Sequence, residues 1–171
     1  MIDQYARDIN YLRVSITDRC NLRCTYCMPK EGISRIGHDD ILRYEEILRI
    51  IRIAAGMGIT KVRITGGEPL VRRGIVEFIA SLGTVQEITD VSLTTNGILL
   101  KDCAEDLFAA GIRRINVSLD SLDAEKYARI TRGGDLRTVL RGIRKAREAG
   151  FSPIKINIVA IKGFNDDEIL E

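Results

Sequence analysis

The sequence predicts an α/β fold, a partial (β/α) barrel of about five parallel strands with helices outside. Three observations predict it. Short runs rich in Val, Ile and Thr alternate with amphipathic runs, the connections between them are short, and each strand has one apolar and one polar face. The 171 residues suit a single domain, so we expect residues 1–171 to form one domain that is truncated at its C-terminal end.

The elements follow in order along the chain. Strands are expected near 11–17, 61–65, 89–95, 113–119 and 154–161, and helices near 44–56, 73–82, 101–110, 123–129 and 135–149. In the last helix Asp135 can cap the first turn, and Gly150 can end the helix in a left-handed conformation. The apolar stripe of this helix comprises Leu136, Val139, Leu140, Ile143 and Ala146. Gly56 or Gly58 and Gly111 can end two other helices in the same way.

The two faces of the strands differ in kind. The apolar face carries Val14, Ile16, Val62, Ile64, Val91, Leu93, Ile115, Val117, Leu119, Ile154, Ile156 and Ile158. The polar face carries Arg13, Ser15, Thr17, Lys61, Arg63, Thr65, Ser92, Thr94, Asn116, Ser118, Asp120, Lys155 and Asn157. A parallel sheet covered on both faces reads as continuous Val, Ile and Leu. A half-exposed antiparallel sheet is the alternative, but helical crossovers between the strands argue against it. The pattern favours an open barrel around a polar chamber for a large, partly anionic ligand.

Composition narrows the function classes. The chain is 45% hydrophobic and 29% charged, with a formal net charge of +2. That charge is too small to indicate nucleic acid or an anionic membrane as a partner. Residues 1–10 lack the apolar stretch of a signal peptide, and no later apolar run could span a bilayer. We therefore expect a cytoplasmic protein, in which clustered cysteines bind metal more often than they form disulfides.

Three cysteines, Cys20, Cys24 and Cys27, directly follow the first strand. They lie in the first loop at the C-terminal end of the barrel, where catalytic groups are found. A structural zinc site needs four ligands, and His38 is the only nearby candidate for the fourth. A 4Fe–4S cluster with three cysteine ligands instead leaves one iron open to a substrate. The isolated Cys103 is expected to be a small core residue.

The run Cys-x3-Cys-x2-Cys with Tyr26 before its last cysteine resembles the signature of the radical S-adenosylmethionine (SAM) enzymes. The resemblance implies a barrel of the radical SAM type and a 4Fe–4S cluster on the three cysteines. In that superfamily the free iron binds SAM, and reduction of the cluster releases a 5′-deoxyadenosyl radical. Tyr26 is then expected against the adenine.

Two later motifs extend the resemblance. Gly66, Gly67 and Glu68 end the second strand, and they resemble the motif that receives the methionine amino group. Alone, a Gly-Gly pair is only a turn. Ser118, with Asn116, matches a position that contacts SAM in the relatives. The alternative for Asn116 and Ser118 is capping of a loop at the strand end.

Five ordered runs also resemble the GTP 3′,8-cyclases, radical SAM lyases that open molybdenum cofactor biosynthesis. These runs are residues 12–21, 26–29, 61–70, 93–97 and 113–120. The resemblance implies conversion of GTP to (8S)-3′,8-cyclo-7,8-dihydroguanosine 5′-triphosphate. It also implies an electron donor of the flavodoxin or ferredoxin type. The expected GTP contacts are Arg13, Arg63, Thr94 and Lys155, with Lys61 assisting. Arginine forks suit phosphate oxygens, and no side chain is assigned a catalytic role beyond the cluster.

The cyclases that the chain resembles are longer. Their C-terminal part carries a second cluster that contacts guanine, and we expect it, together with a sixth strand, to be missing here. An exposed edge near 154–161 would then favour self-association or binding of the missing half. Two alternatives stay open: a radical SAM enzyme acting on a peptide or another small molecule, and a non-catalytic metal-binding fragment.

Overall fold

The computed structural model describes residues 2–32, 37 and 40–169. Five parallel strands form one open sheet in chain order. They are β1 (Tyr11–Ser15), β2 (Lys61–Thr65), β3 (Asp90–Thr95), β4 (Arg114–Ser118) and β5 (Ile154–Asn157). The predicted fold class, a partial (β/α) barrel, is confirmed. No helix in the described part of the chain is long and apolar enough to cross a membrane.

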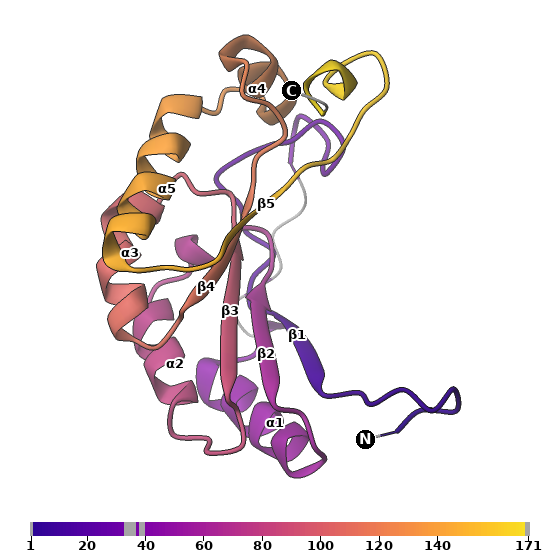
Figure 1. Cartoon of the computed structure of the whole chain (residues 1–171), viewed down its shortest axis with the longest axis vertical. Helices are drawn as coiled ribbons and strands as arrows, with labels where there is room; N and C mark the ends of the chain where they lie inside the picture. The colour runs from indigo at the N-terminus through magenta and orange to yellow at the C-terminus, as the bar shows by residue number, and fades with distance from the viewer. Residues whose placement is uncertain (1, 33–36, 38–39, 170–171) are drawn as a thin grey trace.

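The helices follow the predicted order. They are α1 (Tyr44–Gly56), α2 (Ile75–Leu82), α3 (Leu100–Ala109), α4 (Ala124–Thr131) and α5 (Leu136–Ala149), with the short 3-10 turns η2 (Pro69–Val71) and η3 (Asp166–Glu168). Figure 1 shows α1, α2, α3 and α5 along one side of the sheet. Asp135 caps α5 by accepting the Arg137 N–H, and Gly150 ends α5 with a φ of 104°.

The apolar stripe of α5 differs from the prediction at one position. Leu140 is exposed, whereas Gly142 is buried. A Cβ at Gly142 would lie 2.7 Å from the carbonyl oxygen of Gly97, so the helix backbone itself packs on the turn after β3. This close approach centres the buried stripe on Val139, Gly142 and Ala146 and turns Leu140 toward solvent.

The core lies between the helices and the apolar face of β2, β3 and β4. Val62, Ile64, Leu93, Ile115 and Val117 are all buried there. The prediction is wrong for the last strand, where Ile156 in β5 is 43% exposed and Ile158, just after β5, is 52% exposed. The reason is that, among the described residues, β5 pairs with β4 alone, and that β5 ends at Asn157, four residues before the predicted end at residue 161.

Register aligns the polar side chains in rows across the sheet. Arg13 pairs with Arg63, and Arg63 pairs with Ser92. One row further along, Thr94 pairs with Asn116, and Asn116 pairs with Lys155. Because paired residues of neighbouring strands point to the same face, the predicted polar face is continuous from β1 to β5.

Candidate functional site

The candidate site begins in the cysteine loop, residues 18–28, which follows β1. One side of this loop is fixed to the end of β2. The N–H of Gly67 donates to the carbonyl oxygen of Thr17 at 2.8 Å, and the N–H of Glu68 donates to that of Arg19 at 2.7 Å. The loop therefore leaves β1 along a defined path.

The Gly66-Gly67 pair makes this path possible. A Cβ on Gly66 would lie 2.5 Å from the carbonyl oxygen of Thr17, and one on Gly67 would lie 2.4 Å from that of Arg19. Gly66 also has a φ of 146°, a conformation that other residues rarely adopt. The close backbone approach predicted for these glycines is therefore made by the cysteine loop. Their contact with a methionine amino group stays a prediction.

The other side of the cysteine loop is fixed to the end of α4. Arg23 and Thr25 donate their N–H groups to the carbonyl oxygens of Thr131 and Ile130, at 3.3 and 2.8 Å. The Arg132 guanidinium donates to the carbonyl oxygens of Arg23 and Met28, at 2.9 and 2.8 Å. Arg132 reaches them from a left-handed backbone conformation, with a φ of 55°. The cysteine loop is thus bonded along both sides.

The three thiols of the loop are unbridged. Cys20 and Cys24 are partly buried, and Cys27 is exposed. Burial raises the pKa of the Cys24 thiol to about 11, and the negative charges of Asp120, Cys20 and Cys27 add to the rise. Burial is also the main cause of a raised pKa at Cys20. The charge of Cys27 contributes to the raised pKa of both other thiols.

The three thiols can be compared with the needs of a single ion and of an iron–sulfur cluster. No group of three His, Cys, Asp or Glu side chains in the described residues converges as one metal ion requires. His38, the fourth ligand of the zinc alternative, lies outside these residues. A 4Fe–4S cluster binds each thiolate to a different iron, so its ligands surround a volume instead of meeting at a point. Three unbridged thiols on one loop fit that group.

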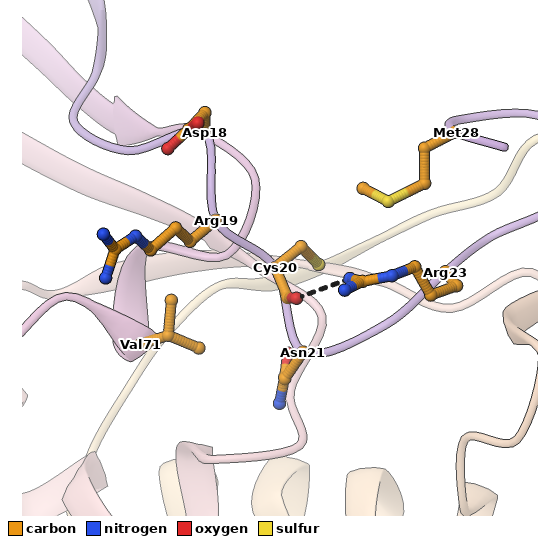
Figure 2. A pocket seen from close by; sticks show the side chains of 7 residues that line it. All are labelled: Asp18, Arg19, Cys20, Asn21, Arg23, Met28 and Val71. Atoms are coloured by element: carbon orange, nitrogen blue, oxygen red, sulfur yellow. Dashed lines mark hydrogen bonds between the residues drawn. The ribbon is translucent and has the colours of Figure 1, made fainter. Parts of the chain in front are cut away.

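A pocket of about 260 Å³ lies beside Cys20. Its lining residues are Asp18, Arg19, Cys20, Asn21, Arg23, Met28 and Val71, as Figure 2 shows. The Arg23 guanidinium donates to the carbonyl oxygen of Cys20 at 3.0 Å, and the N–H of Leu22 donates to the Cys20 sulfur at 3.4 Å. Both the carbonyl oxygen and the sulfur of Cys20 thus accept hydrogen bonds from its own loop.

Glu68 connects the β2 end with the β3 end. Its side chain is 1% exposed. Oε1 accepts from the Leu70 N–H at 3.0 Å and the Thr95 hydroxyl at 2.8 Å, and Oε2 accepts from the Asn96 N–H at 2.6 Å. Burial raises the pKa of this carboxyl, and the three hydrogen bonds oppose the rise. Both oxygens predicted to face an ammonium group thus already accept hydrogens from the chain.

Tyr26 connects the cysteine loop with the β4 end. Its hydroxyl donates to Oδ2 of Asp120 at 2.8 Å, while the residue remains 47% exposed. Burial and then the Asp120 carboxylate raise the pKa of Tyr26. Oδ1 of Asp120 accepts the Val159 N–H at 2.9 Å. Asp120 was predicted on the polar face, but its contact with Tyr26 was not predicted. The fixed, accessible ring of Tyr26 suits stacking on a flat ligand.

The other predicted residues lie along the polar face. Asn116 is buried and Ser118 is half-buried on β4, beside Lys155 and Asn157 of β5. Arg63 lies 5.3 Å over the ring of Tyr11. The Nε of Arg63 is buried and has no hydrogen-bond partner in the described part of the chain. A buried donor without an acceptor in the chain is able to donate to a bound ligand or water.

Arg114 is a cation of this face that sequence analysis missed. It pairs with Ser92, and its guanidinium forms an ion pair with Asp90. Arg63, Arg114 and Lys155 line one small pocket. The signal was present, because Arg114 is two residues before Asn116 and so belongs to the same face of β4.

Comparison with known proteins adds a family. The sequence profile of the radical SAM superfamily matches residues 14–171. The GTP 3′,8-cyclase of Thermodesulfovibrio yellowstonii is 57% identical over 170 residues, which cover 99% of this chain and 53% of that protein. The enzyme of the same name from Geobacter sulfurreducens is 54% identical, over 100% of this chain and 52% of that protein. The chain thus spans about half the length of these curated relatives.

Solved structures agree on the fold. Streptococcus suis SuiB bound to its precursor peptide SuiA superimposes with a TM-score of 0.76 at 22% identity, over 94% of this chain and 36% of that one. The structure of anSMEcpe with bound AdoMet gives 0.64 at 22% identity, over 86% and 43%. At these identities the likeness extends to the arrangement of strands and helices alone.

Proposed function

The chain belongs to the radical SAM superfamily, and from this premise we propose that Cys20, Cys24 and Cys27 hold a 4Fe–4S cluster that binds SAM. When bound and reduced, the cluster supplies the electron that cleaves SAM into methionine and a 5′-deoxyadenosyl radical. The observation that carries the proposal is the cysteine loop, fixed on one side to β2 and on the other to α4. This arrangement keeps three reduced thiols in place before any metal is bound.

The residues around the loop are proposed to position SAM. The Tyr26 ring, held by Asp120, offers a face for the adenine. Gly66, Gly67 and Glu68 place the β2 end directly against the cysteine loop, and Asn116 and Ser118 lie at the neighbouring β4 end. In this proposal Glu68 acts mainly by fixing backbone N–H groups, because its own oxygens are already hydrogen-bonded.

We propose GTP as the substrate and a lyase reaction of the GTP 3′,8-cyclase type. The relatives that carry this name are 57% and 54% identical. Arg13, Lys61, Arg63 and Lys155 place four cations on one face, and Thr94 lies in the row of Lys155. Guanidinium and ammonium groups bind phosphate oxygens, and the unpartnered Nε of Arg63 supplies a buried donor for one of them.

The whole cyclisation is proposed for this chain together with the further sequence that its relatives have, since they are about twice as long. A one-electron reductant of the flavodoxin or ferredoxin type is the proposed partner. The cytoplasm, where thiols stay reduced, is the proposed location.

Metal analysis tests this proposal. After anaerobic reconstitution with iron and sulfide, we expect about four iron and four sulfide per chain. Cys24→Ala should lose most of both, whereas the control Cys103→Ala should keep them, because Cys103 packs against the core on α3. With dithionite and SAM, the loaded chain should release 5′-deoxyadenosine. Zinc bound without sulfide would contradict the cluster.

A further inference from the structure

Asn96, directly after β3, reaches across to the cysteine loop. Its side-chain Nδ2 donates to Oδ1 of Asn21 at 2.7 Å. The same Nδ2 donates to the sulfur of Cys20 at 3.8 Å. An amide nitrogen carries two hydrogens, so it can serve both acceptors at once. Asn96 therefore supplies a side-chain donor from another strand end to a sulfur of the three-cysteine set.

The orientation of Asn96 is fixed by its other polar groups. Its N–H donates to Oε2 of buried Glu68 at 2.6 Å, and its Oδ1 accepts the Ile98 N–H at 3.0 Å. Because the amide group is planar, the hydrogen bond to Oδ1 also fixes the direction in which Nδ2 points. That direction is toward Cys20 and Asn21, so the donor is in place before a ligand arrives.

We propose that Asn96 is a positioning residue that hydrogen-bonds the Cys20 sulfur and sets the reduction potential of the metal group held there. The inference rests on the proposed function. A hydrogen bond to a ligating sulfur withdraws electron density from it, which stabilises the more negative, reduced state. Loss of the Asn96 donor should therefore move the potential to more negative values and make the centre harder to reduce.

The rival role for Asn96 is mechanical. It could hold the cysteine loop through Asn21 alone, in which case the contact with sulfur would have no effect of its own. The chain offers a matched pair of variants for this distinction. Asn96→Ser removes the amide donor without adding charge, and its hydroxyl can still accept the Ile98 N–H. Asn21→Ala removes the other acceptor and leaves the donor to Cys20 in place.

The first measurement is a redox titration of the reconstituted chain. Electron paramagnetic resonance monitors the reduced state and gives the midpoint potential. Asn96→Ser should be more negative than the wild type, and Asn21→Ala should match the wild type. Equal midpoint potentials in Asn96→Ser and the wild type would overturn the inference. A shift in Asn21→Ala as large as the shift in Asn96→Ser would also overturn it. A wild type that binds no iron and sulfide would contradict the proposed function, and this inference with it.

The second measurement uses the metal-free chain and needs no activity. In the 15N-labelled protein, the side-chain amide resonances of Asn96 should shift in Cys20→Ala and stay in place in Cys27→Ala. Unchanged resonances in Cys20→Ala would show that the contact is not made and would overturn the inference, even if Asn96→Ser failed to fold or to load.

Discussion

The chain builds the cysteine loop and the cationic face of the strands in opposite ways. The loop is bonded to β2 and α4 through backbone groups. On the strand face, the side chains of Arg13, Lys61 and Lys155 have no hydrogen-bond or ion-pair partner in the described residues. Arg13 even faces a like charge, because it pairs directly with Arg63. The difference is one of internal bonding: the chain itself fixes the cysteine loop, whereas it leaves these cationic side chains without a bonding partner in the described residues.

The largest expected effect is on stability, from a substitution where the end of β2 packs against the cysteine loop. Gly67→Val would place a Cβ 2.4 Å from a backbone oxygen that cannot move independently. We expect the free energy of unfolding to fall by about 3 kcal/mol, together with loss of iron loading. Urea unfolding measures it. Gly56→Ala is the control, because its Cβ meets nothing within 4 Å at the end of α1; it should be neutral or slightly stabilising. Equal destabilisation by both would break the comparison.

A substitution on the cationic strand face should affect ligand binding and leave the stability of the fold almost unchanged. Lys155→Ala is expected to weaken GTP binding about tenfold, because it removes a charged partner for phosphate. Its free energy of unfolding should stay within about 0.5 kcal/mol of the wild type. Calorimetric titration at two salt concentrations measures the affinity, and the difference should shrink in high salt. Arg144→Ala, exposed on α5, is the control and should bind GTP normally. A large loss of stability in Lys155→Ala would show that the strand face, like the cysteine loop, contributes to the stability of the fold, and would contradict the comparison.

Two substitutions at Arg132 distinguish the effect of its hydrogen bonds to the cysteine loop from the effect of its strained backbone. Arg132→Ala loses the hydrogen bonds to the carbonyl oxygens of Arg23 and Met28 and keeps the positive φ, so about 1 kcal/mol of stability should be lost. Arg132→Gly loses the same bonds but relieves the backbone strain, and it should lose less. Thermal unfolding of the two variants measures the difference. If glycine is the worse of the two, backbone strain at residue 132 is not significant.

The smallest effect concerns the N-terminal cap of α5, outside both regions. Hydrogen bonds from Thr138 and Arg137 lower the pKa of Asp135. A carboxyl whose pKa is lowered in the folded state stabilises the fold above its unfolded pKa, and this contribution is lost as the pH falls through its folded pKa. Asp135→Asn should therefore be less stable than the wild type at pH 7, and the gap should close below about pH 4. Chemical unfolding at both pH values checks this, and a gap that widens in acid would contradict it.

Sequence alone predicts the parts of this molecule that depend on local periodicity. The five strands, the caps Asp135 and Gly150, and the polar face of Arg13 and Arg63 all follow from short patterns. The failures involve partners distant in sequence. Ile156 looked like a core residue because alternation cannot reveal that its strand has a neighbour on one side only. Glu68 and Asn96 were recognised as motif members, but their mutual hydrogen bond depends on the packing of β2 beside β3.

Asp120 carries a consequence for the order in which the molecule is assembled. One of its oxygens holds Tyr26, 94 residues earlier in the chain, and the other holds Val159, 39 residues later. The cysteine loop is therefore held by a residue that follows β4, and the carboxylate of this residue is in turn held by the segment after β5. Contacts of such long sequence separation form late in folding. Tyr26 therefore gains this partner only once β4 has joined the sheet, and the partner is itself held only once the segment after β5 has joined.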